Sequence, residues 1–132
     1  MRSWRVDSEG PGEAAWALLA RPSNWPEWAP HLRGAWGLGD GDGEVRQGAM
    51  GAARLLGVVP VPVRIVAKRP DRSWTWRVGE VVEMDHRVQP RAGGCTVGID
   101  LRGPAPLEAA LAESYGPVIA LTLRRLARAI EA

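Results

Sequence analysis

His86 is the residue of this chain best placed to do acid–base chemistry. It lies in a segment where the apolar residues Val82, Met84 and Val88 alternate with polar ones. Alternate side chains of a strand point to opposite faces, so His86 is predicted to lie on the apolar face, with Asp85 on the other. An imidazole there could exchange a proton or a hydrogen bond with a bound molecule, or be a structural histidine bonded to a neighbour or a buried water. Because Asp85 faces away, the two residues are not expected to form a catalytic dyad.

Other residues with reactive or ligand-binding side chains give weaker signals. Tyr115 is the only tyrosine and falls on the apolar stripe of a C-terminal helix, where its hydroxyl either meets a ligand or simply completes the packing. Cys95 faces inward by strand parity and is predicted to be an inert buried thiol. The segment 39–43, Gly-Asp-Gly-Asp-Gly, lacks the ligand ladder of a calcium loop and indicates a hairpin turn. The sequence therefore predicts no metal and no cofactor, and His86 is its one catalytic candidate.

The aromatic residues are concentrated, with seven tryptophans and no phenylalanine. Trp25 and Trp28 are three residues apart and share a face if the segment is helical. Trp28 is predicted to contact a ligand, whereas Trp25 serves packing at least as well. Trp74 and Trp76 share one face of a strand, and burying both leaves less room for a cavity, which argues against a large lipid.

The elements that must position these side chains follow from periodicity. Apolar and polar residues alternate over 4–7, which predicts a short strand, and residues 13–20 suit a short helix that Pro22 ends. Ser23 is expected to cap a second brief helical turn that ends at Pro30. Residues 32–38 suit a strand. The ranges 61–68, 74–78, 82–89 and 95–102 alternate with period two and predict an antiparallel meander with one apolar face.

The same parity places Arg64 and Lys68 on the outer, polar face of the sheet. From residue 106 to 132 the apolar residues recur at helical spacing, which predicts a long C-terminal helix. Pro117 lies inside that pattern and is expected to kink the helix near Gly116. Such a helix could curve over the sheet.

Composition narrows the class of protein. A chain of 132 residues predicts a single domain, 1–132, and a net charge of +2 from 17 basic and 15 acidic residues argues against nucleic-acid binding. The longest apolar run, 55–63, is interrupted by Gly57, Pro60 and Pro62, so no membrane span is expected. A lone cysteine gives no sign of an oxidising compartment, and the cytoplasm is the expected location. The sequence does not indicate an oligomeric state.

The order of elements and several motifs resemble the START-like superfamily (SRPBCC, helix-grip fold), and within it the bacterial polyketide cyclase/dehydrase-type proteins. The resemblance covers essentially the whole chain. It is carried by Trp16, Trp25-Pro26-Glu27-Trp28, Gly48, Ser73-Trp74-Thr75-Trp76, His86-Arg87-Val88, Gly93-Gly94 and Leu123-Arg124-Arg125-Leu126. It implies an α+β fold in which a curved antiparallel sheet of six to seven strands grips the C-terminal helix, with a cavity between them.

The function expected from these observations is the binding of a small hydrophobic or aromatic molecule in that cavity, without identifiable catalysis. One alternative is a polyketide aromatase/cyclase or dehydrase that uses His86, and another is a protein-interaction module. A shared fold does not fix the chemistry, and few charges are expected inside the pocket, which disfavours the cyclase. The predicted ligand-binding residues are Trp28, Val63, Ile65, Trp74, Trp76, Met84, His86, Val97, Ile99, Leu111 and Tyr115.

Overall fold

One antiparallel sheet and two α-helices make up the architecture. The computed structural model describes residues 1–30, 32–39, 43–55 and 59–131. In chain order the elements are β1 (Arg2–Ser8), α1 (Gly12–Ala20), the 3-10 helix η1 (Pro22–Glu27), β2 (Leu32–Trp36), β3 (Met50–Leu55), β4 (Val59–Arg69), β5 (Ser73–Val78), β6 (Val82–Arg91), β7 (Gly94–Arg102) and α2 (Ala105–Glu131).

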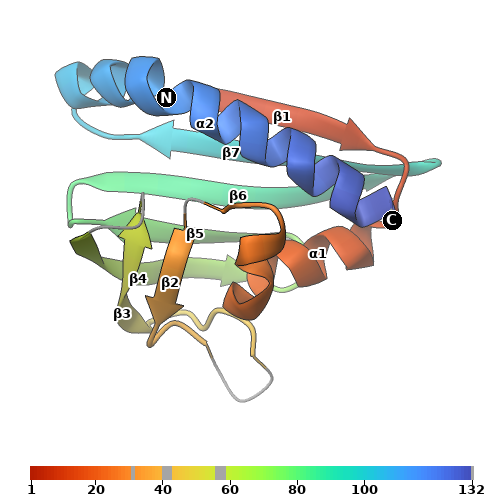
Figure 1. Ribbon diagram of the computed structural model, residues 1–132, viewed down its shortest axis with the longest axis horizontal. Helices are drawn as coiled ribbons and strands as arrows, with labels where there is room; N and C mark the ends of the chain where they lie inside the picture. The colour runs from red at the N-terminus through yellow and green to blue at the C-terminus, as the bar shows by residue number, and fades with distance from the viewer. Residues whose placement is uncertain (31, 40–42, 56–58, 132) are drawn as a thin grey trace.

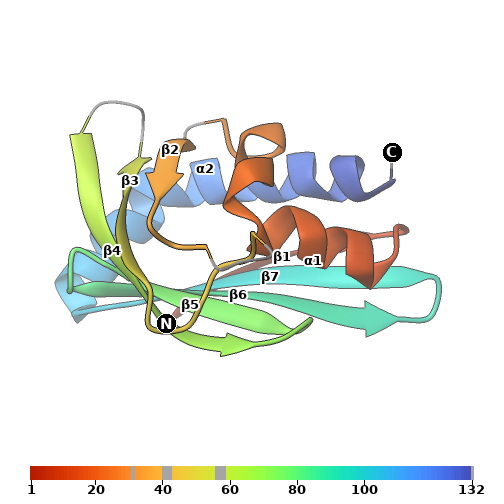
Figure 2. The ribbon, with the colours of Figure 1, turned by 90° about the horizontal axis from the view of Figure 1, so that it is seen from below.

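The sheet has seven strands in the order β1-β7-β6-β5-β4-β3-β2, each antiparallel to its neighbours. Figure 2 shows both helices on one face of this sheet, with the β2–β4 side curling up toward them. This arrangement is the predicted α+β helix-grip fold. The strand β3 had no counterpart in the sequence-based prediction, because its small residues give little alternation.

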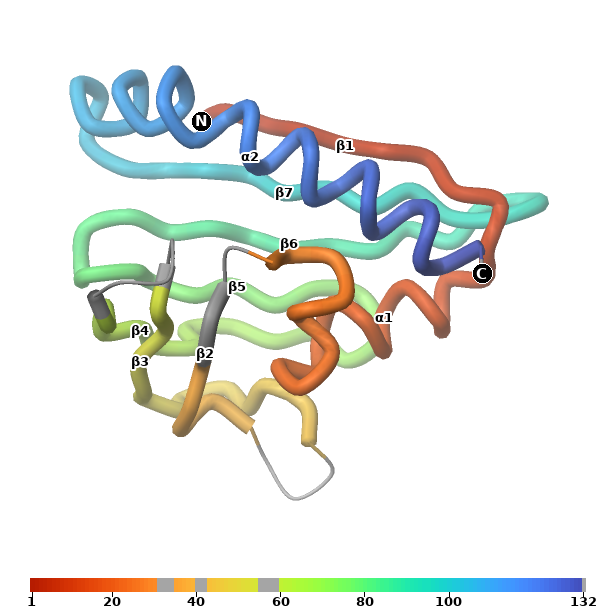
Figure 3. The backbone as a smooth tube through the Cα atoms, in the orientation of Figure 1, coloured from red at the N-terminus to blue at the C-terminus, as the bar shows by residue number. Residues whose placement is uncertain are grey.

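The long helix α2 crosses the sheet and contacts β1, β7, α1 and η1 (Figure 1). Pro117 lies inside the helix, as the sequence predicts. In Figures 1 and 3 the axis of α2 changes direction between its first turns and its C-terminal part. The helix therefore follows the curvature of the sheet, with Leu126 and Ile130 buried near its end.

The tryptophans close the C-terminal end of α1, where a helix leaves its last carbonyl groups without partners. The indole N–H groups of Trp25 and Trp74 both donate to the carbonyl of Leu19, at 2.9 and 3.1 Å. The N–H of Trp28 donates to the carbonyl of Leu18 at 2.8 Å. Three large side chains thereby tie η1 and β5 to α1.

Two local predictions are wrong. Ser23 does not cap a helix: η1 begins at Pro22, its N-cap residue is Arg21, and no side chain bonds to that end. Lys68 does not lie on the outer face with Arg64, because a bulge between Ile65 and Ala67 shifts the register of β4. Lys68 is therefore opposite Trp74, and its ammonium group is 3.0 Å from Glu44.

The segment predicted as a hairpin turn, 39–43, falls partly outside the described residues. Gly39 and Val45, on either side of it, form an antiparallel bridge. No helix in the described part of the chain has the length and apolar character needed to cross a membrane.

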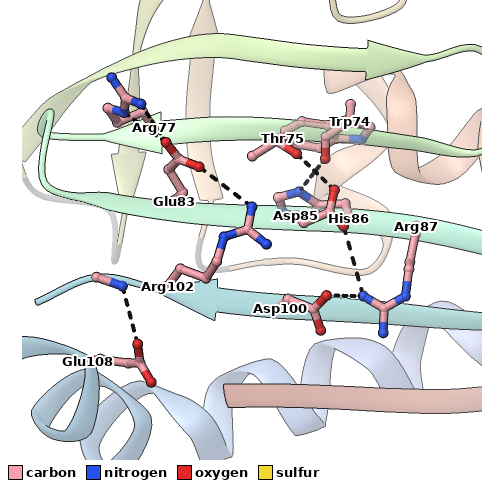
Figure 4. A network of polar contacts seen from close by, with 11 residues as sticks. Trp74, Thr75, Arg77, Glu83, Asp85, His86, Arg87, Asp100, Arg102 and Glu108 are labelled. Carbon is pink, nitrogen blue, oxygen red and sulfur yellow. Dashed lines mark hydrogen bonds and ion pairs between the residues drawn. The ribbon is translucent and has the colours of Figure 1, made fainter. Parts of the chain in front are cut away.

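Polar side chains join strands β5, β6 and β7 on the face opposite the helices (Figure 4). Asp85 accepts a hydrogen bond from Thr75 at 2.8 Å, and Arg87 forms an ion pair with Asp100. The guanidinium of Arg87 lies against Gly98, where an added Cβ atom would be 2.9 Å from Nη2. These contacts fix the outward residues of β6, so His86, between Asp85 and Arg87, points to the helix side.

Candidate functional site

A cavity of about 250 Å³ lies between strands β5–β7, helix α2 and the residues that follow η1. Its walls are almost entirely apolar. The lining residues are Trp28, Ala29, Trp76, Val78, Val82, Met84, His86, Ile99, Leu101, Leu111, Tyr115, Ile119 and Thr122. The sheet supplies one part of the lining and α2 another, and Trp28 and Ala29, which follow η1, complete it.

The structure brings most of the predicted ligand-binding residues to this cavity. Those that line it are Trp28, Trp76, Met84, His86, Ile99, Leu111 and Tyr115. Val63, Ile65, Trp74 and Val97 are buried in the hydrophobic core instead and do not line it. Trp74 is instead in contact with Leu19 of α1, through its indole N–H, and with Trp25 of η1, on which it stacks.

Several lining residues were not among the predicted ones: Ala29, Val78, Val82, Leu101, Ile119 and Thr122. Strand parity could have found Val78, Val82 and Leu101, since each is two residues from a predicted lining residue. Ile119 and Thr122 follow Tyr115 at four and seven residues, which is one face of a helix. Because Thr122 is polar, the spacing of apolar residues alone does not identify this face of the helix.

Aromatic rings build the wall around His86. The imidazole is stacked on the indole of Trp74, with centroids 3.9 Å apart and planes 12° apart. Trp74 is stacked in turn on Trp25, at 5.5 Å and 13°. Trp76 stands edge-on to His86, with centroids 5.7 Å apart. These contacts fix the orientation of the imidazole relative to the cavity.

The protonation state of His86 follows from its surroundings. The residue is 4% exposed, and burial lowers its pKa from 6.5 to about 4, so the ring is neutral at pH 7. Its Nδ1 lies 3.3 Å from the carbonyl oxygen of Trp74 (Figure 4). A carbonyl only accepts, so Nδ1 carries the proton and Nε2 carries a lone pair.

The other polar groups of the cavity are also uncharged. Burial raises the pKa of the Tyr115 hydroxyl, which stays protonated at neutral pH. Thr122 donates its hydroxyl proton to the carbonyl of Ile119 at 2.8 Å. Cys95 is buried outside the cavity, and burial raises the pKa of its thiol, which disfavours the reactive thiolate.

Among the described residues no cluster of three or more histidine, cysteine or acidic side chains could hold a metal ion. The arrangement can enclose an apolar molecule and offer it one strong hydrogen-bond acceptor, Nε2 of His86. The fold and the cavity together define a helix-grip domain with an internal apolar pocket.

The sequence profile of the family described as "Polyketide cyclase / dehydrase and lipid transport" matches residues 4–131. The chain belongs to this family, within the START-like superfamily. A search of curated protein sequences finds no significant match.

Solved structures share the fold at low sequence identity. Protein NE0264 from Nitrosomonas europaea is 15% identical with a TM-score of 0.76, and the alignment covers 98% of this chain and 93% of that one. A protein from Thermobifida fusca is 18% identical with a TM-score of 0.75, over 97% and 91% of the two chains. DynU16, described as a protein in the dynemicin biosynthetic locus, is 16% identical with a TM-score of 0.72, over 98% and 46%. At these identities the likeness shows the fold alone.

Proposed function

We propose that this protein binds a small, uncharged, apolar molecule in the cavity between strands β5–β7 and helix α2. The observation that carries the proposal is the cavity itself: about 250 Å³ remains open although the neighbouring half of the core is filled by tryptophan. Ligand pockets are typically concave, apolar and furnished with a few polar groups. The family description, which includes lipid transport, supports the same role.

The test uses 2-methylnaphthalene, an apolar probe without a hydrogen-bond donor, in calorimetric titration and thermal unfolding. A ligand that binds only the folded state at 100 times its Kd stabilises it by about 2.7 kcal/mol, so a clear rise in Tm is expected. Absence of both heat and Tm shift at saturating probe would refute the proposal.

A pair of variants assigns the binding to this cavity. Met84 lines the cavity, and Met84→Trp should fill much of it and abolish binding. Met50 is 71% exposed and does not line the cavity, so Met50→Trp makes the same change of residue type elsewhere and should leave binding intact. Equal loss in both variants would contradict the assignment.

Proton transfer by His86 is a second candidate, favoured by the position of this residue in the cavity wall. General bases work best when their pKa lies near the operating pH, and a pKa of about 4 makes His86 a weak base at pH 7. Binding is therefore the better-supported function. Turnover of an aromatic polyketide substrate by the wild type, lost in His86→Ala under conditions where both proteins are folded, would favour the enzyme.

A further inference from the structure

The size of the cavity limits its occupant. A cavity of roughly 150 Å³ lined by apolar side chains is large enough to bind benzene. The volume here, about 250 Å³, adds roughly the space of a second fused ring. Drug-sized ligands occupy pockets of about 300–1,000 Å³, so a long-chain lipid or a four-ring polyketide exceeds this cavity.

The charge of the walls limits the occupant further. His86 and Tyr115 are the titratable residues among those that line the cavity, and both are neutral at pH 7. An ionised carboxylate or phosphate would lose its hydration there without meeting a positive charge. The occupant is therefore expected to be neutral.

Two polar groups of the lining residues lack a hydrogen-bond partner in the described part of the chain: Nε2 of His86, and the indole N–H of Trp76, which is buried. Nδ1 of His86 is used by the Trp74 carbonyl, whereas Nε2 has no hydrogen-bond partner among the described residues. Two other polar groups of the wall are already engaged, since Trp28 donates to Leu18 and Thr122 to Ile119. A buried acceptor without a donor costs free energy, so a ligand that supplies one hydrogen-bond donor gains where a purely apolar one does not.

The rings that flank this acceptor indicate the shape of the ligand. Trp76 and His86 both line the cavity and stand edge-on to each other, with planes 84° apart. Two perpendicular rings in one corner offer a further flat ring either stacked or edge-to-face contact, the two geometries that aromatic pairs prefer.

We propose that the cavity is specific for a neutral aromatic alcohol of one or two rings, whose hydroxyl donates a hydrogen bond to Nε2 of His86. This inference rests on the proposed function, because it specifies the ligand class of the same site. It concerns recognition alone and involves no covalent step.

The experiment compares 2-naphthol with 2-methylnaphthalene, two probes of nearly equal shape that differ in the hydroxyl donor. Both are titrated into the wild type and into His86→Phe, which keeps a ring over Trp74 but removes the acceptor. The ratio of the two affinities, naphthol to methylnaphthalene, is expected to fall about tenfold or more from wild type to His86→Phe, as for loss of one hydrogen bond to a buried acceptor.

An unchanged ratio would overturn the inference while leaving the proposed function intact, since methylnaphthalene binding does not depend on the hydroxyl. Failure of both probes to bind the wild type would overturn the proposed function and this inference with it. If His86→Phe does not fold, the NMR resonances of the imidazole nitrogens in the wild type test the hydrogen bond instead. The chain has two histidines, so the resonances that remain in the spectrum of His31→Gln are those of His86. Nε2 of His86 should shift with 2-naphthol and not with 2-methylnaphthalene, and equal responses would refute the hydrogen bond.

Discussion

The imidazole of His86 lies parallel to the indole of Trp74, with ring centroids 3.9 Å apart and planes 12° apart. The same imidazole forms part of the cavity wall. His86 therefore joins two regions of the interior, the tryptophan-filled core beneath α1 and the open cavity beneath α2. Its replacement should change the stability of the protein as well as its ligand binding.

The first prediction concerns this packing. His86→Ala removes a buried ring from the stack and should lower the free energy of unfolding by about 2–4 kcal/mol, in the range of large-to-small core replacements. His86→Phe keeps the ring and should cost clearly less. Urea unfolding at pH 7, followed by tryptophan fluorescence, measures both. Equal stability of His86→Ala and the wild type would show that the stack contributes little.

The second prediction follows from the lowered pKa of His86, about 4 in the folded protein against 6.5 in the unfolded chain. Between these values the unfolded state binds a proton that the folded state does not, so stability falls as the pH falls. The contribution of His86 is complete above about pH 6.5. It should decrease by about 3 kcal/mol as the pH approaches 4, and then level off.

Urea unfolding between pH 7 and pH 4 measures this loss, and His86→Phe is the control because it lacks the titrating group. Stability of the variant should depend less on pH between 6.5 and 5, above the titration of most carboxylates. Wild type and variant with the same slope in this window would contradict the assignment of the pKa shift to His86.

Periodicity was enough to predict the central strands and the long helix, because each has one buried and one exposed face. It failed where the register depends on a tertiary detail. The bulge near Val66 turned Lys68 to the helix side of the sheet, although simple alternation places Lys68 with Arg64. A bulge inserts one residue and leaves no reliable mark in the residue types.

For the site, parity predicts which side chains face inward but not which inward side chains border open space. Trp74 and Trp76 lie two residues apart on one strand face, yet Trp76 lines the cavity and Trp74 does not. The difference arises from Trp25, which stacks on Trp74 from a distant segment. Strand periodicity carries no information on that contact, so the boundary between core and cavity required the structure.

The third prediction concerns the shared acceptor. Trp25 and Trp74 donate to the same carbonyl of Leu19, so either single replacement by phenylalanine leaves that carbonyl with one donor. The double variant leaves it with none of these donors and should lose about 1 kcal/mol more than the sum of the single variants. A double-mutant cycle of urea unfolding free energies measures this excess.

Trp16→Phe serves as the control, because the indole N–H of Trp16 is buried without a hydrogen-bond partner in the described part of the chain. Combined with Trp25→Phe, it should give a coupling energy closer to zero. If the changes in unfolding free energy of Trp25→Phe and Trp74→Phe simply added, loss of the second donor would cost no more than loss of the first, which would contradict this prediction.

The fourth prediction concerns Gly98 and the ion pair on the outer face of the sheet. Alanine normally stabilises a strand interior relative to glycine, by about 0.5–1 kcal/mol. At Gly98 the sign should be reversed, because the new Cβ atom would lie 2.9 Å from Nη2 of Arg87. That guanidinium forms an ion pair with the carboxylate of Asp100, which is 8% exposed. If the guanidinium moved away, the buried carboxylate of Asp100 would lose its partner.

Gly98→Ala should therefore destabilise the wild type by about 1 kcal/mol, and Arg87→Ala by about 2 kcal/mol. In the Arg87→Ala background the clash is gone, so Gly98→Ala should become neutral or stabilising. This change of sign identifies the mechanism, because a clash with the backbone would persist without Arg87. Gly98→Ala equally destabilising in both backgrounds would show that the guanidinium is not what the glycine accommodates.

Arg91→Ala is the matched arginine control: its contact with exposed Asp7, at 3.9 Å, should be worth less than about 0.5 kcal/mol.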